Sequence, residues 1–200
     1  MIKTFIFDLG NVIVSFDHSK IVHRLKTVCE QTHEEIYSKA ITSQLVREYN
    51  VGKITSAEFY DAVNRELDLR MDFADFSQAW NCTFVPEPII SEQTVKSLSE
   101  KYKLLVLSDT NELHFDYIVE NFPILNYIDD FILSHKVSCV KPSPEIFRAA
   151  VKIAGCLPEE CFFVDDVAAN VEGAVKLGLN AIQFISAEQF EEELKTRNLI

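Results

Sequence analysis

The sequence predicts an α/β fold in which a parallel sheet is covered by helices and a helical segment is inserted after the first strand. Three observations predict it. Short apolar runs without alternation recur along the chain, helical patterns lie between them, and residues 16–85 show helical periodicity alone. Strands that alternate with helices are typical of an open α/β sheet, and the single break in the alternation indicates an insertion.

The predicted strands are short runs of Phe, Ile, Leu and Val. Continuous apolar runs are typical of strands buried on both faces, as in a parallel sheet between two layers of helices. Four runs have this character and a fifth follows Gly178; they are residues 4–7, 104–107, 131–133, 162–164 and 181–185. The predicted helices of this part of the chain are residues 89–101, 112–121, 144–154, 168–177 and 187–196.

The segment 16–85 contains no convincing buried strand. Thr55 followed by Glu58 forms a capping-box pattern, which predicts that a helix starts there. The prolines at positions 86 and 88 are expected to end the helical segment. The apolar stripes at helical spacing are Ile21, Leu25 and Val28; Phe59, Val63 and Leu67; and Phe73, Phe76, Trp80 and Phe84.

These patterns divide the chain into two units. We predict an α/β core made of residues 1–15 and 86–200 and a helical cap made of residues 16–85. An insertion after the first strand lies over the carboxyl ends of the strands, which is where ligands bind in open α/β sheets.

The composition excludes several classes of protein. The 200 residues are 48% hydrophobic and 25% charged, as in ordinary soluble proteins, and the net charge of −12 argues against nucleic acid or an anionic membrane as partner. No apolar run reaches the roughly 18 residues of a membrane span, and the N-terminal run is too short for a signal peptide. We therefore expect a cytoplasmic monomer or homodimer. Its five scattered cysteines predict reduced thiols and no zinc ribbon; they are Cys29, Cys82, Cys139, Cys156 and Cys161.

Polar residues stand at the ends of the predicted strands. Asp8 follows the first strand, residues 108–111 (Ser-Asp-Thr-Asn) end the second, Lys141 follows the third, and Asp165-Asp166 ends the fourth. Because the carboxyl ends of parallel strands share one edge of a sheet, these side chains are expected to meet. Taken singly, several have a structural explanation: Gly10-Asn11 as a turn, residues 108–111 as a helix N-cap, and Lys141 as a surface lysine.

Asp8 and the Asp165-Asp166 pair are harder to explain as structural residues. A charge buried beside apolar strands is costly unless it is paired or bound to a metal, and adjacent carboxylates repel each other. Carboxylates and a backbone carbonyl suit Mg²⁺, while a lysine, a serine hydroxyl and helix N-terminal N–H groups suit phosphate. Together these groups supply what phosphoryl transfer through an aspartyl-phosphate requires.

The order of these motifs resembles that of the haloacid dehalogenase (HAD) superfamily over essentially the whole chain. The residues within these motifs are similar to those of bacterial sugar-phosphate phosphatases of the α-D-glucose-1-phosphate phosphatase type. The resemblance implies a Rossmann-like core with an inserted helical cap, and Mg²⁺-dependent hydrolysis of a small phosphorylated metabolite, a sugar phosphate in this subgroup. The segments that carry it are FDLGNVIV at 7–14, LSDTN at 107–111, KP at 141–142 and FFVDDVAANVEGAVKLG at 162–178.

The resemblance also implies a role for each motif residue. Asp8 attacks phosphorus, Lys141 steadies Asp8 and the transferred group, and Asn170 orients the acids of the fourth motif or caps their turn. The implied metal ligands are Asp8, the backbone carbonyl of Gly10 and Asp166, with Asp165 either alongside them or behind them without direct contact to the metal. The implied phosphate ligands are Ser108, the N–H of Asp109, Asn111 and Lys141.

Gly10 departs from the family's pattern, because most of its phosphatases carry at this position an aspartate that serves as general acid and base. Such a group contributes about 10²–10⁴ in rate. Two alternatives therefore stay open: a 2-haloacid dehalogenase-like hydrolase, which the retained Asp165-Asp166 pair disfavours, and a catalytically weak phosphometabolite-binding or regulatory protein. A substrate with a good leaving group, such as an anomeric hydroxyl, would tolerate the glycine.

Asp109 is the second departure, because the family more often has asparagine there. Its carboxylate would weaken phosphate binding unless it points away or meets a cation. Substrate selectivity is expected from the cap and from the loop after the first strand, where Asp17 could accept a sugar hydroxyl. His18 could donate to phosphate or replace the missing acid, or it could simply start a helix. Further candidates are Arg47, Tyr49, Asn50, Trp80, Asn81 and His114.

Overall fold

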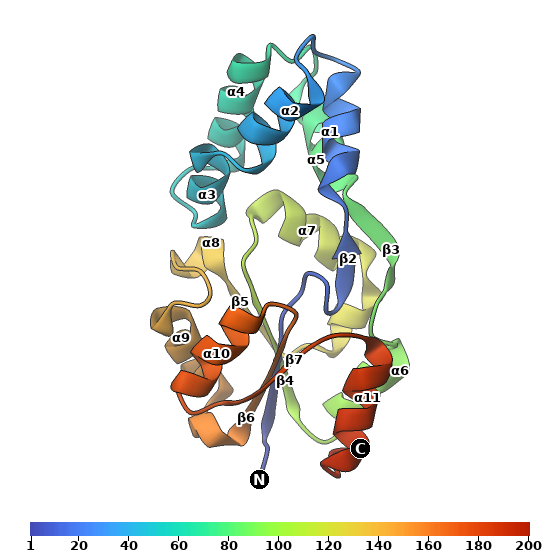
Figure 1. Ribbon diagram of the computed structural model, residues 1–200, viewed down its shortest axis with the longest axis vertical. Coiled ribbons are helices and arrows are strands. Elements are labelled where there is room, and N and C mark those ends of the chain that lie inside the picture. The colour runs from blue at the N-terminus through green and yellow to red at the C-terminus, as the bar shows by residue number, and fades with distance from the viewer.

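The computed structural model describes residues 1–200 and has two layers of structure along its long axis (Figure 1). The lower part in that view is a five-stranded parallel sheet with the order β5-β4-β1-β6-β7. Its strands are β1 (Thr4–Phe7), β4 (Lys103–Ser108), β5 (Asp130–Leu133), β6 (Cys161–Asp165) and β7 (Asn180–Gln183). All five predicted strands are present, and the predicted α/β fold is confirmed.

Helices cover both faces of the sheet because its side chains alternate between two apolar clusters. Phe5 and Phe7 pack on one face with the side chains of α6 (Glu92–Ser99), α7 (Glu112–Asn121) and α11 (Ala187–Thr196). Ile6 packs on the other face with α9 (Pro144–Ala154) and α10 (Ala168–Lys176). Strands buried on both faces explain the unbroken apolar runs of the sequence. The short connections contain α8 (Ser134–Val137), η2 (Pro123–Tyr127) and η3 (Pro158–Glu160).

The helices at the opposite end of the molecule form a layer with an apolar core of its own (Figure 1). Phe59 lies at the centre, with its ring 4.4 Å from that of Tyr49 and 4.9 Å from that of Trp80. Thr55 caps α4 and forms the predicted capping box with Glu58. The elements are α1 (His18–Lys26), α2 (His33–Ile36), the π-helical turn η1 (Tyr37–Ile41), α3 (Gln44–Asn50), α4 (Ser56–Leu67) and α5 (Phe73–Asn81).

Three details of this segment differ from the sequence prediction. Residues 14–16 and 84–88 form an antiparallel pair, β2 (Val14–Phe16) and β3 (Phe84–Pro88), which connects the two parts of the molecule. The prolines at 86 and 88 therefore lie in a strand, because the last helix has already ended at Asn81. Val28 lies beyond the end of α1. No helix is long and apolar enough to cross a membrane.

Hydrogen bonds link the helical layer to α7 and α8, which follow the strands β4 and β5. The hydroxyl of Tyr49 accepts the backbone N–H of Leu113 at 3.1 Å, and the Ser134 hydroxyl donates to the backbone carbonyl of Asn50 at 2.6 Å. The Ser56 hydroxyl donates to Glu112 at the start of α7. These contacts hold α3 and α4 over the carboxyl ends of the strands.

Candidate active site

The three central strands bring the predicted acidic and phosphate-binding residues to one edge of the sheet. Ser108 is the last residue of β4, Asp8 follows β1, and Asp165 is the last residue of β6. Because β1 lies between β4 and β6 in parallel register, the three side chains arrive at the same level. The sequence expectation that the strand ends form one site is in agreement with this topology.

Lys141 is a buried cation that joins two of these strand ends. Its Nζ donates to Asp8 Oδ1 at 2.6 Å, to Asp165 Oδ2 at 2.6 Å and to the Leu107 carbonyl at 3.1 Å. All three N–H groups of the ammonium are thereby used, and its side chain is 2% exposed. Lys141 is therefore not a surface lysine: it sets the orientation of the Asp8 carboxylate.

The electrostatics of the site are dominated by burial. Burial raises the pKa of Asp8 to about 7, and the Lys141 ammonium opposes this rise. Burial also acts against the charge of Lys141, but the surrounding carboxylates Asp8, Asp165 and Asp109 outweigh it and raise the pKa of the ammonium. The lysine is therefore charged throughout the physiological range, and it favours the ionised form of Asp8.

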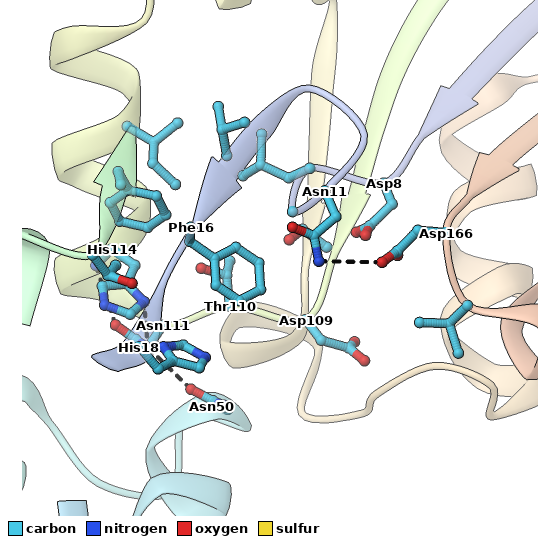
Figure 2. Close-up of a pocket in the computed structure, with 18 of the residues that line it drawn as sticks. Asp8, Asn11, Phe16, His18, Asn50, Asp109, Thr110, Asn111, His114 and Asp166 are labelled. Atoms are coloured by element: carbon cyan, nitrogen blue, oxygen red, sulfur yellow. Dashed lines mark hydrogen bonds between the residues drawn. The ribbon is translucent and has the colours of Figure 1, made fainter. Parts of the chain in front are cut away.

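Asp165 is saturated by hydrogen bonds. Its Oδ1 accepts the backbone N–H of Val167 at 2.8 Å, its Oδ2 accepts Lys141, and Asn170 Nδ2 reaches both oxygens at 3.0 and 3.1 Å. Asn170 is buried in the first turn of α10, where it orients the carboxylate of Asp165. Asp166 is more open, and its Oδ2 accepts Asn11 Nδ2 at 3.2 Å (Figure 2).

The acidic side chains fit a divalent cation. Asp8, Asp165 and Asp166 each offer an oxygen, and these atoms lie within 4.8 Å of one another. With Asp109 nearby the site holds four carboxylates against the single buried ammonium of Lys141, so a bound Mg²⁺ would offset excess negative charge. Because Asp165 is already saturated, Asp8 and Asp166 are the carboxylates best suited to contact the ion, and Gly10 lines the cavity beside them.

The acidic cluster forms one end of a cavity of ≈ 300 Å³ between the sheet edge and the helical layer (Figure 2). Ser108, Asp109 and Lys141 line it from the sheet side. Phe16, His18, Asn50, Trp80, Thr83 and Phe84 line it from β2, β3 and the helices. A cavity with a charged floor and a mixed polar and aromatic wall suits a small anionic ligand that carries an uncharged body.

Asn111 joins this wall to the sheet. It is the N-cap of α7, where its Oδ1 accepts the backbone N–H of His114 at 3.1 Å and Trp80 Nε1 at 3.4 Å. Its Nδ2 donates to Asn50 Oδ1 at 3.1 Å. Asn111 therefore lines the cavity, with its amide engaged by the protein.

Asp17 does not line the cavity. Its side chain is exposed and caps α1 by accepting the backbone N–H of Ser19 at 2.9 Å, which holds the pKa of its carboxyl below the ordinary value. The expectation that it binds a sugar hydroxyl finds no support in this position. Arg47 is likewise exposed and donates to the Thr42 carbonyl.

Thr83 lines the cavity although no sequence signal pointed to it, and Asn11, which the sequence explained as a turn residue, lines the cavity as well. Asn11 follows Gly10 in the left-handed backbone region, with φ 56, which is uncommon for a residue other than glycine. That conformation lets it donate to Asp166. Thr83 lies in the turn directly before β3, and its carbonyl accepts the backbone N–H of Asp17 directly after β2, so its place depends on a strand pair that the sequence pattern did not reveal.

Asp109 accepts a backbone hydrogen bond with its carboxylate. Its Oδ1 and Oδ2 lie 3.1 and 3.2 Å from the backbone nitrogen of Lys141, and burial raises the pKa of the carboxyl. We predict that Asp109→Asn keeps this hydrogen bond through its amide oxygen and leaves KM for a phosphate ester unchanged or lower, because a negative charge at the cavity mouth is removed. Steady-state kinetics check this. A clear rise in KM would show that the carboxylate has a positive role.

His114 is buried in the neutral form. Burial lowers its pKa to about 3, and Nε2 lies 3.2 Å from the Trp80 carbonyl. Because the unfolded chain takes up this proton near the ordinary pKa of 6.5, stability falls as the pH falls from about 6.5 towards 3. We predict that the free energy of unfolding falls more steeply below pH 6.5 in the wild type than in His114→Gln, by about 1.4 kcal/mol per pH unit. Urea unfolding at pH 7, 6 and 5 tests this, and equal slopes would contradict it.

A parallel sheet with a ligand cavity at its carboxyl edge is the architecture of many α/β enzymes. The chain belongs to the haloacid dehalogenase-like hydrolases, whose family model matches residues 2–178. This match confirms the family and the hydrolase class inferred from the motifs. The glucose-1-phosphate type of substrate stays a prediction.

The relatives include two curated phosphatases. D-ribitol-5-phosphate phosphatase of Bacteroides thetaiotaomicron is 26% identical over 200 residues, covering 97% of this chain and 97% of the relative. Phosphatase MT3486 of Mycobacterium tuberculosis is 25% identical over 193 residues, covering 90% of this chain and 86% of the relative.

Solved structures share the fold. A HAD family enzyme from Bacteroides thetaiotaomicron, crystallised in complex with magnesium and inorganic phosphate, superposes with a TM-score of 0.87 at 29% identity, covering 96% of this chain and 99% of that one. L-2-haloacid dehalogenase from Xanthobacter autotrophicus superposes with a TM-score of 0.65 at 20% identity, covering 98% of this chain and 83% of that one, which shows a common fold alone.

Proposed function

We propose that the protein is a Mg²⁺-dependent phosphatase that hydrolyses a small phosphorylated metabolite, a sugar phosphate, through an aspartyl-phosphate on Asp8. The observation that carries the proposal is the Asp8 carboxylate, fixed by Lys141 at the charged end of a cavity and flanked by Asp166. The names of the two curated relatives support phosphate esters as the substrate class.

In the first step an oxygen of Asp8 attacks phosphorus, the bond from phosphorus to the leaving oxygen breaks, and that oxygen departs with the bonding electrons. The Ser108 hydroxyl and the backbone N–H of Asp109 bind phosphate oxygens, and Lys141 holds Asp8 in line. Asp8, Asp166 and the Gly10 carbonyl would hold Mg²⁺, which would offset negative charge on the transferred group.

In the second step water attacks phosphorus, the bond from phosphorus to the Asp8 oxygen breaks, and inorganic phosphate and the free carboxylate are released. The carboxylate of Asp8 is then ready for another turnover. Asp165 acts as a positioning residue, because it accepts a hydrogen bond from the same Lys141 ammonium that binds Asp8.

We further propose that residues 16–85 form the cap of a core made of residues 1–15 and 86–200 and that the cap selects the substrate. Its separate apolar core and its place over the strand ends support this. We place the enzyme in the cytoplasm, where its five cysteines, all free in the structure, would stay reduced.

The test is phosphate release from a panel of phosphorylated metabolites in Mg²⁺ and in EDTA. We expect release in Mg²⁺ and at least a roughly 100-fold lower rate in EDTA, because the carboxylates around the substrate dianion are then left uncompensated. Restoration by added Mg²⁺ is the control. Release of halide from 2-haloacids in EDTA would point to a dehalogenase instead, and binding of sugar phosphates without turnover would point to a binding protein.

A further inference from the structure

The groups that could give a proton to a leaving oxygen above Asp8 are already engaged by the protein. Lys141 uses all three of its N–H groups on Asp8, Asp165 and a backbone carbonyl. The ring nitrogens of His114 face the Trp80 carbonyl and the Asn111 amide. Neither of these side chains has a donor free for the substrate.

Gly10 supplies no side chain to the cavity, and Phe16 occupies the adjoining space. A Cβ atom built on Gly10 would lie 2.7 Å from Cε1 of the Phe16 ring. The ring is held from its other side by His18, with 4.8 Å between the ring centroids. The position two residues after Asp8 is therefore closed to a proton-donating side chain unless Phe16 moves.

Asp109 and His18 are the remaining candidate donors. Both carboxylate oxygens of Asp109 accept the backbone N–H of Lys141. Phe16 separates His18 from Asp8. Figure 2 shows the Phe16 ring between His18 and the loop that carries Asp8 and Asn11. Nδ1 of His18 is buried without a hydrogen-bond partner, and the His18 ring packs against that of Phe16. His18 is better placed to contact the body of a substrate than its scissile oxygen.

We propose that the enzyme transfers the phosphoryl group to Asp8 without a general acid and is therefore selective for phosphates whose leaving oxygen is weakly basic. This inference rests on the proposed phosphatase function. The bond from phosphorus to the leaving oxygen breaks as the bond to Asp8 forms, the oxygen leaves as an anion, and it takes a proton from solvent water afterwards. Hemiacetal, enol, acyl and phenol oxygens meet this requirement, whereas the alkoxide of a primary alcohol does not.

The test compares nitrophenyl, phenyl and benzyl phosphates, which share an aromatic ring but differ in the basicity of the leaving oxygen. We expect kcat/KM to fall by roughly 10²-fold or more from nitrophenyl to benzyl phosphate, the size of the contribution that a general acid would make. The ratio kcat/KM reports the first transfer, so slow release of phosphate from Asp8 does not mask the effect. Values within a few-fold of one another would overturn the inference but leave the phosphatase function standing. No release from any ester or metabolite would instead remove the proposed function.

A pair of double variants tests the cause of the selectivity. Gly10→Asp with Phe16→Ala places a carboxyl group in the space of the ring, and Gly10→Asn with Phe16→Ala adds the same bulk without a proton to give. We expect the aspartate variant to exceed the asparagine variant by about tenfold or more on benzyl phosphate and to differ little on nitrophenyl phosphate. Equal rates on benzyl phosphate would contradict the inference.

His18→Gln tests the rival donor in the wild-type background. If His18 gave the proton, the substitution would slow the hydrolysis of benzyl phosphate far more than that of nitrophenyl phosphate, and the inference would fail. We expect the ratio of the two kcat/KM values to stay within about twofold of the wild type, because His18 lies behind Phe16.

Discussion

Asp8→Asn is expected to lower the rate of phosphate release by roughly 10⁴-fold or more, because the amide oxygen cannot form the covalent intermediate. The substitution keeps the shape of the side chain, and its Oδ1 can still accept the Lys141 ammonium that lies 2.6 Å away in the wild type. Burial already raises the pKa of Asp8 to about 7, so an uncharged side chain is tolerated at this site. We therefore expect the fold to persist while activity is lost.

The control for this substitution is Asp72→Asn, because Asp72 is the N-cap of α5 and does not line the cavity. Asparagine caps helices about as well as aspartate, so activity and thermal unfolding should be unchanged. Phosphate release is measured for both variants in Mg²⁺ at equal protein concentration. Retention of more than about a tenth of the wild-type rate by Asp8→Asn would rule out Asp8 as the nucleophile.

Lys141→Met should cost both activity and stability. The substitution leaves Asp8 and Asp165 facing each other at the strand ends with no cation between them. Removing one partner of a buried ion pair is destabilising by about 3–5 kcal/mol, because the other charges stay buried. Activity should fall to near background, because Asp8 loses the contact that orients it.

The loss of stability in Lys141→Met should depend on pH. Without Lys141 the pKa of Asp8 rises further, because the ammonium no longer opposes burial and Asp165 still repels it. A carboxyl group whose pKa is raised in the folded state makes the protein less stable as the pH rises. The difference in free energy of unfolding between the wild type and Lys141→Met should therefore be larger at pH 8 than at pH 5. Urea unfolding of both proteins at the two pH values measures it. Lys3→Met, which removes a pair on the surface, is the control, and equal stability of Lys141→Met and wild type would contradict this account.

The strands and helices of the core were predictable because burial on both faces leaves a simple pattern. The run at residues 4–7 coincides with β1, and the predicted helix 187–196 coincides with α11. The pair β2–β3 was not predictable in the same way. β2 has three residues, β3 contains two prolines and is partly exposed, and neither shows a continuous apolar run.

The strand-end residues of the candidate site could be predicted because sheet topology alone brings Asp8, Ser108 and Asp165 together. The side of the cavity that the helical layer and the pair β2–β3 form depends on tertiary contacts that leave no local signal. Thr83 reaches the cavity through an unpredicted strand, and Phe16 reaches Gly10 through a turn. The N-cap role of Asp17 had a signal in the sequence, because Asp is among the preferred N-cap residues and Asp17 stands directly before the helix α1.

The most direct test of the account is the stereochemistry of phosphoryl transfer from a substrate that the panel identifies. A phosphate ester made chiral at phosphorus with oxygen isotopes is hydrolysed in the presence of an acceptor alcohol, and the configuration of the transferred group is determined. Each in-line displacement inverts phosphorus. Transfer through Asp8 involves two displacements and predicts net retention, whereas net inversion would mean that the acceptor attacks the substrate directly and that Asp8 forms no covalent intermediate.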